Sequence, residues 1–417
     1  MKFKILSAVK DSGRLTKVSA ASLAVVGLGA LVVGQVGAGT TPLHVNTVSA
    51  QMPITTVPTT STTKMTMPPV TIPQQSGVFN VVKYGADPSG HKNSTFGIRA
   101  AIDAAQQSPG STVFFPPGRY ILQRVPNQGL FDFVINAPIH IVGSGQGVTT
   151  IVNEVGAKVP GIPHGTNIFV INSANDSTSG GGSGTTISNM TLDSRSFDAG
   201  TSIMDFGNHT VLSDLTVYAP HSTDAYNQNA FGVRVIAICN PTNRKNVIRV
   251  GNVVKNVTII GTGGAGNTEL DLSCQVDSSV DNVSITGNGM DIFYSHNDSI
   301  SNVQFTAVVP TDFSWVITGS QNIRIANVTT NNSGGKIEPD PVDLSSGILV
   351  SNEVMANPAG HLFIGDVKDV AISASKLSTI VLWPKESISG VALLNTTHGT
   401  VACKPHSSIS GLAGFTC

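Results

Sequence analysis

Residues 267–286 read NTELDLSCQVDSSVDNVSIT, and residues 287–307 read GNGMDIFYSHNDSISNVQFTA. A shift of twenty residues aligns the two segments and places Asp271 on Asp291. Short β-branched runs that are closed by Asn, Ser and Gly and repeat at this length are typical of the coils of a solenoid. The rest of the chain is interpreted outward from this tandem repeat.

The aspartate of each copy stands between two apolar residues, as Asp271 does between Leu270 and Leu272. Alternation of this kind has the period of a β-strand, so Asp271 and Asp291 are expected to point outward from the same place in successive coils. Strands stacked in this way lie ~4.8 Å apart. Two carboxylates at that spacing need a cation, a shared proton or good solvation.

The composition favours an all-β fold and argues against a nucleic-acid partner. The chain has 417 residues, a formal charge of −1 and 12 % charged residues, without a basic patch. Its 43 glycines, together with frequent Asn, Ser and Thr, indicate many turns. We expect a monomer.

The sequence divides into three regions. A basic start followed by an uncharged apolar run predicts a signal peptide at residues 1–50. The apolar run is long enough to span a bilayer, so a retained anchor is the alternative. Residues 51–76 form a Thr/Pro-rich linker, and residues 77–417 form the folded domain. We therefore expect a secreted or cell-surface protein whose mature domain does not enter a membrane.

The four cysteines become candidates for disulfides if the chain is exported. Four cysteines allow three pairings, of which we favour Cys239–Cys274 and Cys403–Cys417. Four buried free thiols are the alternative.

The start of the folded domain combines three segments. FNVVKYGADPSG spans residues 79–90, a helical pattern runs from Ser94 to Gln107, and TVFFPPGRYIL spans residues 112–122. Together they resemble the opening of the pectate-lyase-like superfamily of right-handed parallel β-helices. The resemblance implies an all-β solenoid of roughly ten coils, with the short helix capping its N-terminal end.

A short motif, in which Asn, Asp or Gly precedes an apolar–x–apolar triplet, recurs along the chain. It starts at Asn189, Asp214, Asn256, Asn282, Asn302, Asn327, Asp369, Gly390 and Gly411. Most intervals are between 20 and 26 residues, and the two intervals of 42 are interpreted as pairs of coils. Because Asn tolerates the left-handed conformation of a tight bend, we predict a stacked ladder of Asn side chains.

A second pattern places an aspartate before an apolar residue at Asp205, Asp271, Asp291 and Asp312, with spacings of 66, 20 and 21. We predict that the last three stack on adjacent coils and that Asp205 lies on the same face three coils earlier. Phe293 would then point outward beside Asp291 as a surface for sugar stacking. The alternative is that each aspartate caps a turn.

Two chemistries suit such a column. A carboxylate pair cleaves a glycosidic bond when one member is protonated and the other ionised, and this needs no cofactor. Alternatively, Asp271 and Asp291 would hold Ca²⁺, which acidifies a uronate so that a basic residue removes its C5 proton. His296, near the pair, is a candidate proton carrier. Arg249, Lys255 and Arg324 are interpreted as solvated charges.

The tandem repeat also resembles the active-site coils of the polygalacturonase family of glycoside hydrolases. Asn267-Thr268-Glu269 stands where that family has Asn-Thr-Asp, and Gly289-Met290-Asp291 stands where it has Gly-Asp-Asp. The resemblance implies that Glu269 and Asp291 are catalytic. It covers about forty residues, and the Gly-His-Gly and Arg-Ile-Lys segments of the family have no counterpart.

The sequence therefore predicts a glycoside hydrolase that cleaves a uronate-containing, pectin-like polymer with Asp291 and either Glu269 or Asp271. A Ca²⁺-assisted polysaccharide lyase or epimerase is the first alternative. A non-catalytic carbohydrate-binding or adhesion module at the cell surface is the second, because one fold hosts many functions.

Overall fold

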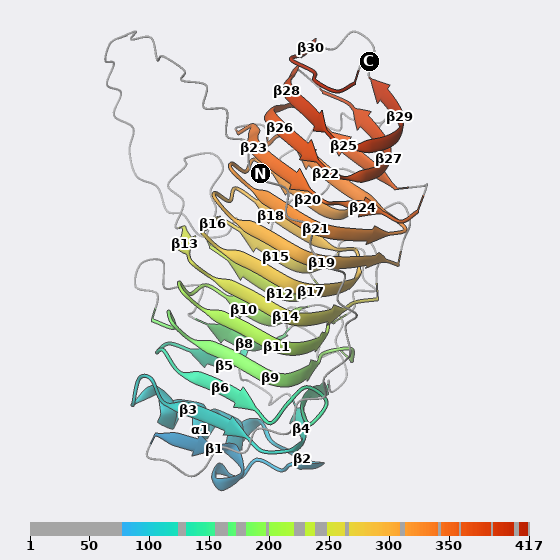
Figure 1. Ribbon diagram of the computed structural model, residues 1–417. Coiled ribbons are helices and arrows are strands. Elements are labelled where there is room, and N and C mark those ends of the chain that lie inside the picture. Colours follow the sequence, from blue (N-terminus) through green and yellow to red (C-terminus); the bar gives the residue numbers. More distant parts are fainter. Residues whose placement is uncertain are drawn as a thin grey trace, which may run out of the picture. The chain divides into compact units, whose positions relative to one another are not determined.

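The computed structural model describes residues 77–123, 131–154, 166–171, 181–196, 200–220, 230–237, 248–262, 267–308, 313–340, 343–357, 360–384, 387–403 and 408–415. These residues fold as the predicted right-handed parallel β-helix, in which nearly every strand pairs in parallel with the strand one coil away (Figure 1). The predicted signal peptide and linker lie outside these ranges.

One long ladder of parallel strands, the first ladder, follows the solenoid from end to end. Its strands are β1 (Val78–Asn80), β3 (Thr112–Phe115), β6 (His140–Gly143), β9 (Thr186–Asp193), β11 (Val211–Tyr218), β14 (Val253–Ile260), β17 (Ser279–Gly287), β19 (Ser299–Ala307), β21 (Arg324–Asn331), β23 (Ser345–Ser351), β26 (Val367–Ser373), β28 (Ser387–Leu394) and β30 (Ser408–Ser410).

The second ladder lies across the core from the first. Its strands are β5 (Phe131–Ile135), β8 (Thr166–Ile171), β10 (Gly200–Asp205), β12 (Ala230–Ile236), β15 (Asn267–Ser273), β18 (Met290–Phe293), β20 (Phe313–Thr318), β22 (Gly334–Glu338), β25 (His361–Ile364), β27 (Lys376–Leu382) and β29 (Thr397–Cys403).

Shorter elements complete the coils. They are β2 (Ser89–Asn93), β4 (Gly118–Gln123), β7 (Thr149–Glu154), β13 (Arg249–Val250), β16 (Gln275–Val276), β24 (Val354–Met355) and the 3-10 turn Val81–Tyr84. The helix α1 (Thr95–Gln106) lies at the N-terminal end, as predicted, with Ile98, Ala101, Ile102 and Ala105 buried. Among the described residues, no helix is long and apolar enough to cross a membrane.

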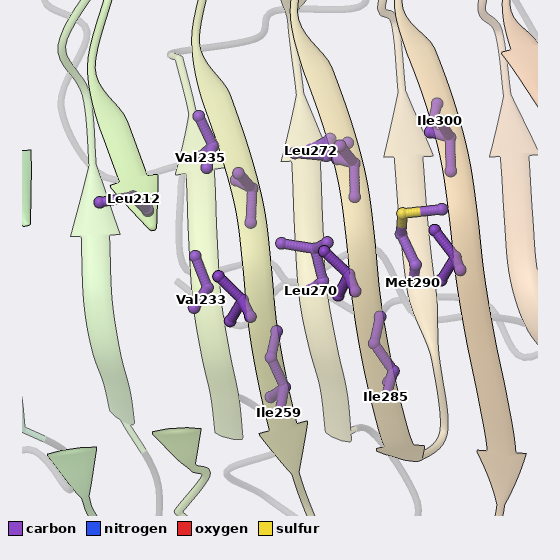
Figure 2. Close-up of a cluster of buried hydrophobic side chains, with 14 of the residues drawn as sticks. Leu212, Val233, Val235, Ile259, Leu270, Leu272, Ile285, Met290 and Ile300 are labelled. Atoms are coloured by element: carbon purple, nitrogen blue, oxygen red, sulfur yellow. The ribbon is translucent and has the colours of Figure 1, made fainter. Parts of the chain in front are cut away.

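The core consists of columns of aliphatic side chains that stack from coil to coil. Val233 and Leu270 point inward from successive strands of the second ladder, and Ile259 and Ile285 point toward them from the first (Figure 2). All four are at most 2 % exposed. A single coil has no second layer against which to bury this face, so the coils stabilise one another.

The bends of the coils confirm the predicted Asn ladder. All nine residues that begin the repeated motif have a positive φ, between 52° and 66°. Asn282 donates its side-chain amide to Oδ1 of Asn256 at 2.8 Å, and Asn327 donates to Oδ1 of Asn302 at 3.0 Å. The side chains thus satisfy one another along the stack while the backbone turns.

The interpretation of 42 residues as two coils is wrong for the interval from Asp214 to Asn256. Strand β11 pairs directly with β14, and Val211 lies opposite Val253. One longer coil fills the interval. Spacing alone does not distinguish an enlarged coil from two short ones.

Neither described cysteine is a free thiol: Cys274 and Cys403 are both disulfide-bonded. Cys239 and Cys417 lie outside the described residues, so the pairing of the four cysteines stays a prediction.

A buried carboxyl group interrupts the apolar core. Glu353 is 0 % exposed and accepts a hydrogen bond from the indole Nε1 of Trp315 at 3.0 Å, while its Oε2 has no hydrogen-bond partner among the described residues. Loss of solvent raises the pKa of Glu353 to about 7, and the indole bond opposes this only in part.

We expect Asn302→Ala to lower the free energy of unfolding by about 2 kcal/mol, because alanine is strained in the left-handed region and loses the hydrogen bonds of the ladder. Asn302→Gly should cost less, since glycine adopts the same φ without strain. Chemical denaturation of the two variants checks the order. Equal losses would contradict a conformational role for this residue.

We expect Glu353 to stabilise the fold at acidic pH. Its folded pKa of about 7 lies above the unfolded value, so the contribution is complete below pH ~4.5 and is lost as the pH rises through about 7. Glu353→Gln should therefore remove up to about 3 kcal/mol of pH dependence from the unfolding free energy. Thermal unfolding between pH 5 and pH 8 (about the window set by the shift) tests this. An unchanged pH dependence would contradict the assignment.

Candidate functional site

One outward column of the second ladder carries charged side chains in neighbouring coils. The backbone register places Asp271 opposite Asp291, as the twenty-residue shift predicted. The part of this column from β10 to β25, which we call the Asp291 column, runs through Met204, Arg234, Asp271, Asp291, Val316, Lys336 and Phe363. Opposite charges therefore lie on the same face within a few strand spacings of ~4.8 Å.

Asp271 is held by its neighbours on both sides. Arg234 donates from Nε to its Oδ2 at 2.8 Å, and Ser273 donates from Oγ to its Oδ1 at 2.6 Å. The guanidinium of Arg234 also lies over the ring of Phe231, with 4.0 Å from Cζ to the ring centroid. Asp271 is 3 % exposed and both of its oxygens are engaged. It is therefore a buried, ion-paired carboxyl group beside Asp291.

Asp291 is partly exposed and accepts a hydrogen bond on Oδ2 from the hydroxyl of Thr268 at 2.8 Å. Loss of solvent, and next the charge of Asp271, raise the pKa of Asp291 to about 7. The Thr268 bond and the charge of Lys336 act in the opposite direction. Asp291 therefore keeps a proton in a substantial fraction of molecules near neutral pH.

A cation and three phenyl rings lie beyond Asp291. Lys336 pairs with Glu338, with 2.5 Å between Nζ and Oε2. Its ammonium lies 5.4 Å from the ring centroid of Phe313 and 5.7 Å from that of Phe363, within the range of cation–π attraction. Phe293 points outward beside Asp291, as predicted, and is partly exposed.

Glu269, predicted to be catalytic, is enclosed instead. It is 1 % exposed, and its Oε2 accepts backbone N–H groups from Asn288 at 2.6 Å and Gly289 at 2.7 Å. A Cβ on Gly261 or Gly287 would overlap its carboxyl group. Burial raises the pKa of Glu269 to about 7. These hydrogen bonds serve a backbone bend and not the outer face.

Asp205 is not on the face of Asp291. It lies opposite Val235, one residue away from Arg234 in register, and is 0 % exposed. Its Oδ1 accepts the backbone N–H of Gly207 at 2.7 Å. A shift of one residue moves a strand side chain to the opposite face, and a spacing of 66 residues cannot resolve such a shift.

The predicted stack of three aspartates is wrong at its third member. Val316 lies opposite Asp291, and Asp312 lies outside the described residues. His296 lies opposite Val276, as the twenty-residue shift predicts. This pairing comes after the end of β18 and is therefore away from the Asp291 column. The proposed role of His296 as a proton carrier has no contact in support.

Of the three basic residues that were predicted to be solvated charges, two are exposed and one is buried. Lys255 and Arg324 are exposed, as predicted. Arg249 is 3 % exposed, so its interpretation is wrong. Burial raises the pKa of the nearby Asp205 to about 7, and the charge of Arg249 opposes this in part.

Sequence reasoning missed Arg234, Lys336 and Glu338. The signal is the one that identified Asp271, because each charge follows an inward residue of its strand: Val233 precedes Arg234, and Ile337 precedes Glu338. A pattern limited to aspartates does not reveal a column of mixed charge.

The donor set does not fit Ca²⁺, which takes six to eight oxygen ligands. Both oxygens of Asp271 are engaged, and Asp291 offers a single carboxyl group. In the part of the chain that the structure describes, no group of three or more His, Cys, Asp or Glu could hold a metal ion.

The family model described as rhamnogalacturonase A/epimerase, pectate lyase-like, matches residues 78–337, which is more than half of the chain. Among curated proteins of Azotobacter vinelandii, alginate lyase 7 is 37 % identical over 73 residues, or 18 % of this chain and 8 % of that protein. Mannuronan C5-epimerase AlgE1 is 40 % identical over 75 residues, or 18 % of this chain and 5 % of that protein. The chain thus spans a small part of these relatives.

Solved structures share the fold. The tailspike protein of E. coli bacteriophage HK620, solved in complex with a pentasaccharide, matches with a TM-score of 0.59 and 11 % identity, over 81 % of this chain and 65 % of that one. PfbA, a surface adhesin of Streptococcus pneumoniae, matches with a TM-score of 0.50 and 12 % identity, over 79 % and 91 %.

We expect Asp271→Asn to lower the pKa of Asp291 from about 7, because the substitution removes a neighbouring negative charge and releases Arg234 from its ion pair. Carboxyl NMR titration of Asp-labelled protein measures the change. Asp214→Asn, which alters a partly exposed carboxyl group of the first ladder, is the matched control and should leave Asp291 unaffected. A pKa of Asp291 that stays near 7 in Asp271→Asn would contradict the described coupling.

Proposed function

The chain belongs to the rhamnogalacturonase A/epimerase, pectate lyase-like family, and on this premise we propose that it cleaves an extracellular, uronate-bearing polysaccharide along the outer face of the second ladder. Asp291 is the proton donor. The predicted signal peptide at residues 1–50 and the polymeric substrate both favour a place outside the cell or at its surface.

One observation carries this proposal. Asp291 is a partly exposed carboxyl group whose pKa is raised to about 7 beside a carboxylate that Arg234 keeps in place. Paired carboxyl groups whose environments separate their pKa values are typical of acid–base catalysis. The aromatic rings of Phe293, Phe313 and Phe363 supply apolar surface against which sugar rings can stack.

Asp271 is unsuited to act as the base, because its side chain is 4 % exposed and paired with Arg234, whereas that of Glu338 is 23 % exposed and within reach of water. Glu338 takes that role in our proposal. It lies on β22, two coils from Asp291, so the strands are ~10 Å apart, and carboxyl groups of inverting glycosidases are separated by a comparable distance that leaves room for water. The bond from its neighbour Thr318 to Oε1 is 3.4 Å long.

The reaction then balances in one displacement. Asp291 gives its proton to the glycosidic oxygen as the bond from that oxygen to the anomeric carbon breaks. A water molecule attacks the same carbon from the opposite side and gives a proton to Glu338. Lys336, which lies on the same strand as Glu338 and pairs with it, contributes the positive charge that favours a uronate.

The matches to alginate lyase 7 and to mannuronan C5-epimerase favour a second candidate, β-elimination or C5 epimerisation of a uronate. In that case a basic group removes the C5 proton, and Lys336 is the cation of the Asp291 column that lies beyond the acids. Elimination leaves an unsaturated sugar that absorbs in the ultraviolet, whereas hydrolysis does not.

We expect the full chain to release reducing ends from a uronate polymer, and Asp291→Asn to lower the rate by about 10²–10⁴, the range for loss of general acid catalysis. The rate should fall as the pH rises above about 7, because Asp291 then loses its proton. Reducing ends and ultraviolet absorbance are followed together on polygalacturonate, alginate and a neutral glucan.

Asp214→Asn is the control and should retain activity, since it lies on the first ladder. Products that absorb in the ultraviolet would show that the chain acts by elimination and not by hydrolysis. Binding without any product, unchanged in Asp291→Asn, would refute the catalytic proposal in favour of a binding module.

A further inference from the structure

Trp383 is an unusual surface residue. The chain has two tryptophans: Trp315 is 0 % exposed in the core, whereas Trp383 is 50 % exposed. Large aromatic side chains are buried to a high degree on average. A half-exposed indole is therefore a feature whose position on the fold needs an explanation.

The backbone register places Trp383 on the face of the candidate site. It follows Leu382, which is 0 % exposed and points into the core, and its N–H bonds to the carbonyl of Ile364 at 2.9 Å. Because side chains alternate along a strand, Trp383 points outward from the second ladder.

A second outward column, two residues from the Asp291 column in the register, leads from Glu338 to this indole. Phe293, which stands beside Asp291, lies opposite Thr318, and Thr318 lies opposite Glu338. Trp383 directly follows the last residue of β27, and β27 lies two coils beyond β22. Four strand spacings of ~4.8 Å separate β18 from β27, so Trp383 lies ~19 Å along the solenoid from Asp291.

The surface next to this end of the column is apolar. Phe363 and Val381 are partly exposed on the neighbouring outward column and lie opposite each other. Gly365 stands between Glu338 and Trp383 and contributes no side chain. Beyond Glu338, the partly exposed side chains of Phe363 and Val381 and the half-exposed indole of Trp383 are apolar.

We propose that Trp383 forms a distal subsite that stacks on a sugar ring of the same polysaccharide chain whose glycosidic bond lies at Asp291. An indole face recognises the apolar face of a pyranose and not its charge, so the subsite takes the polymer backbone whether or not that ring is a uronate. The inference rests on the proposed function, since it uses the same chain and the same face.

The test compares short and long oligogalacturonates on the full chain by calorimetry. Long oligomers reach across the ~19 Å, whereas short ones fill the site at Asp291 alone. Trp383→Ala should weaken binding of long oligomers about fivefold to tenfold, the size of one aromatic contact, and leave short ones unchanged. Trp383→Phe should restore part of the loss. Leu394→Ala removes a side chain of similar exposure, 52 %, from the first ladder and is the matched control.

Tryptophan fluorescence gives an independent readout. Long oligomers should change the emission of the wild-type protein and not that of Trp383→Phe, because Trp315 is enclosed in the core and bonded to Glu353. Equal affinities of wild type and Trp383→Ala for long oligomers would overturn the subsite. If Asp291→Asn still abolished product formation in that case, the proposed function would stand, whereas the absence of binding by any acidic oligomer would overturn both.

Discussion

The parallel register of the coils is the constraint on which the rest of this structure depends. Each strand residue lies opposite its counterpart one coil away, so like side chains stack on like. Inside, this gives aliphatic columns such as Val233 and Leu270; at the bends it gives the Asn ladder. Outside, the same rule concentrates charges that are twenty or more residues apart in sequence. A solenoid therefore brings acids together without any loop having to place them.

Stacking of charge has a cost that the column itself offsets. Two adjacent carboxylates repel one another, and here Arg234 is the next residue in the register on the far side of Asp271. Asp271 is buried in its ion pair with Arg234, and loss of solvent together with the charge of Asp271 raises the pKa of Asp291 to about 7. The two acids therefore differ because of the order of residues along the column, in which the cation Arg234 is followed by the buried Asp271 and then by the partly exposed Asp291.

The fold could be predicted from the sequence because it depends on periodicity. The alternation around Asp271 gave the correct register with Asp291, and the recurrent Asn, Asp or Gly gave the bends. The site could be predicted only in part. Asp205 and Glu269 carry the right chemistry but face the interior, and a shift of one residue or a local bulge decides that direction. Neither is visible in residue spacing.

The irregularity at Glu269 shows why the site differs from a plain coil. The backbone N–H groups of both Glu269 and Leu270 point to the single carbonyl of Gly289, at 3.1 and 3.2 Å, so the strand is displaced where it begins. Thr268 would face inward in a regular strand, since Leu270 does, yet its hydroxyl reaches Asp291. The carboxyl group of Glu269 accepts the N–H groups of Asn288 and Gly289 and so fixes the bend that precedes β18. The carbonyl of Gly289 in this bend is the one that receives both N–H groups of the displaced strand. Glu269 therefore supports the backbone from which Thr268 reaches Asp291.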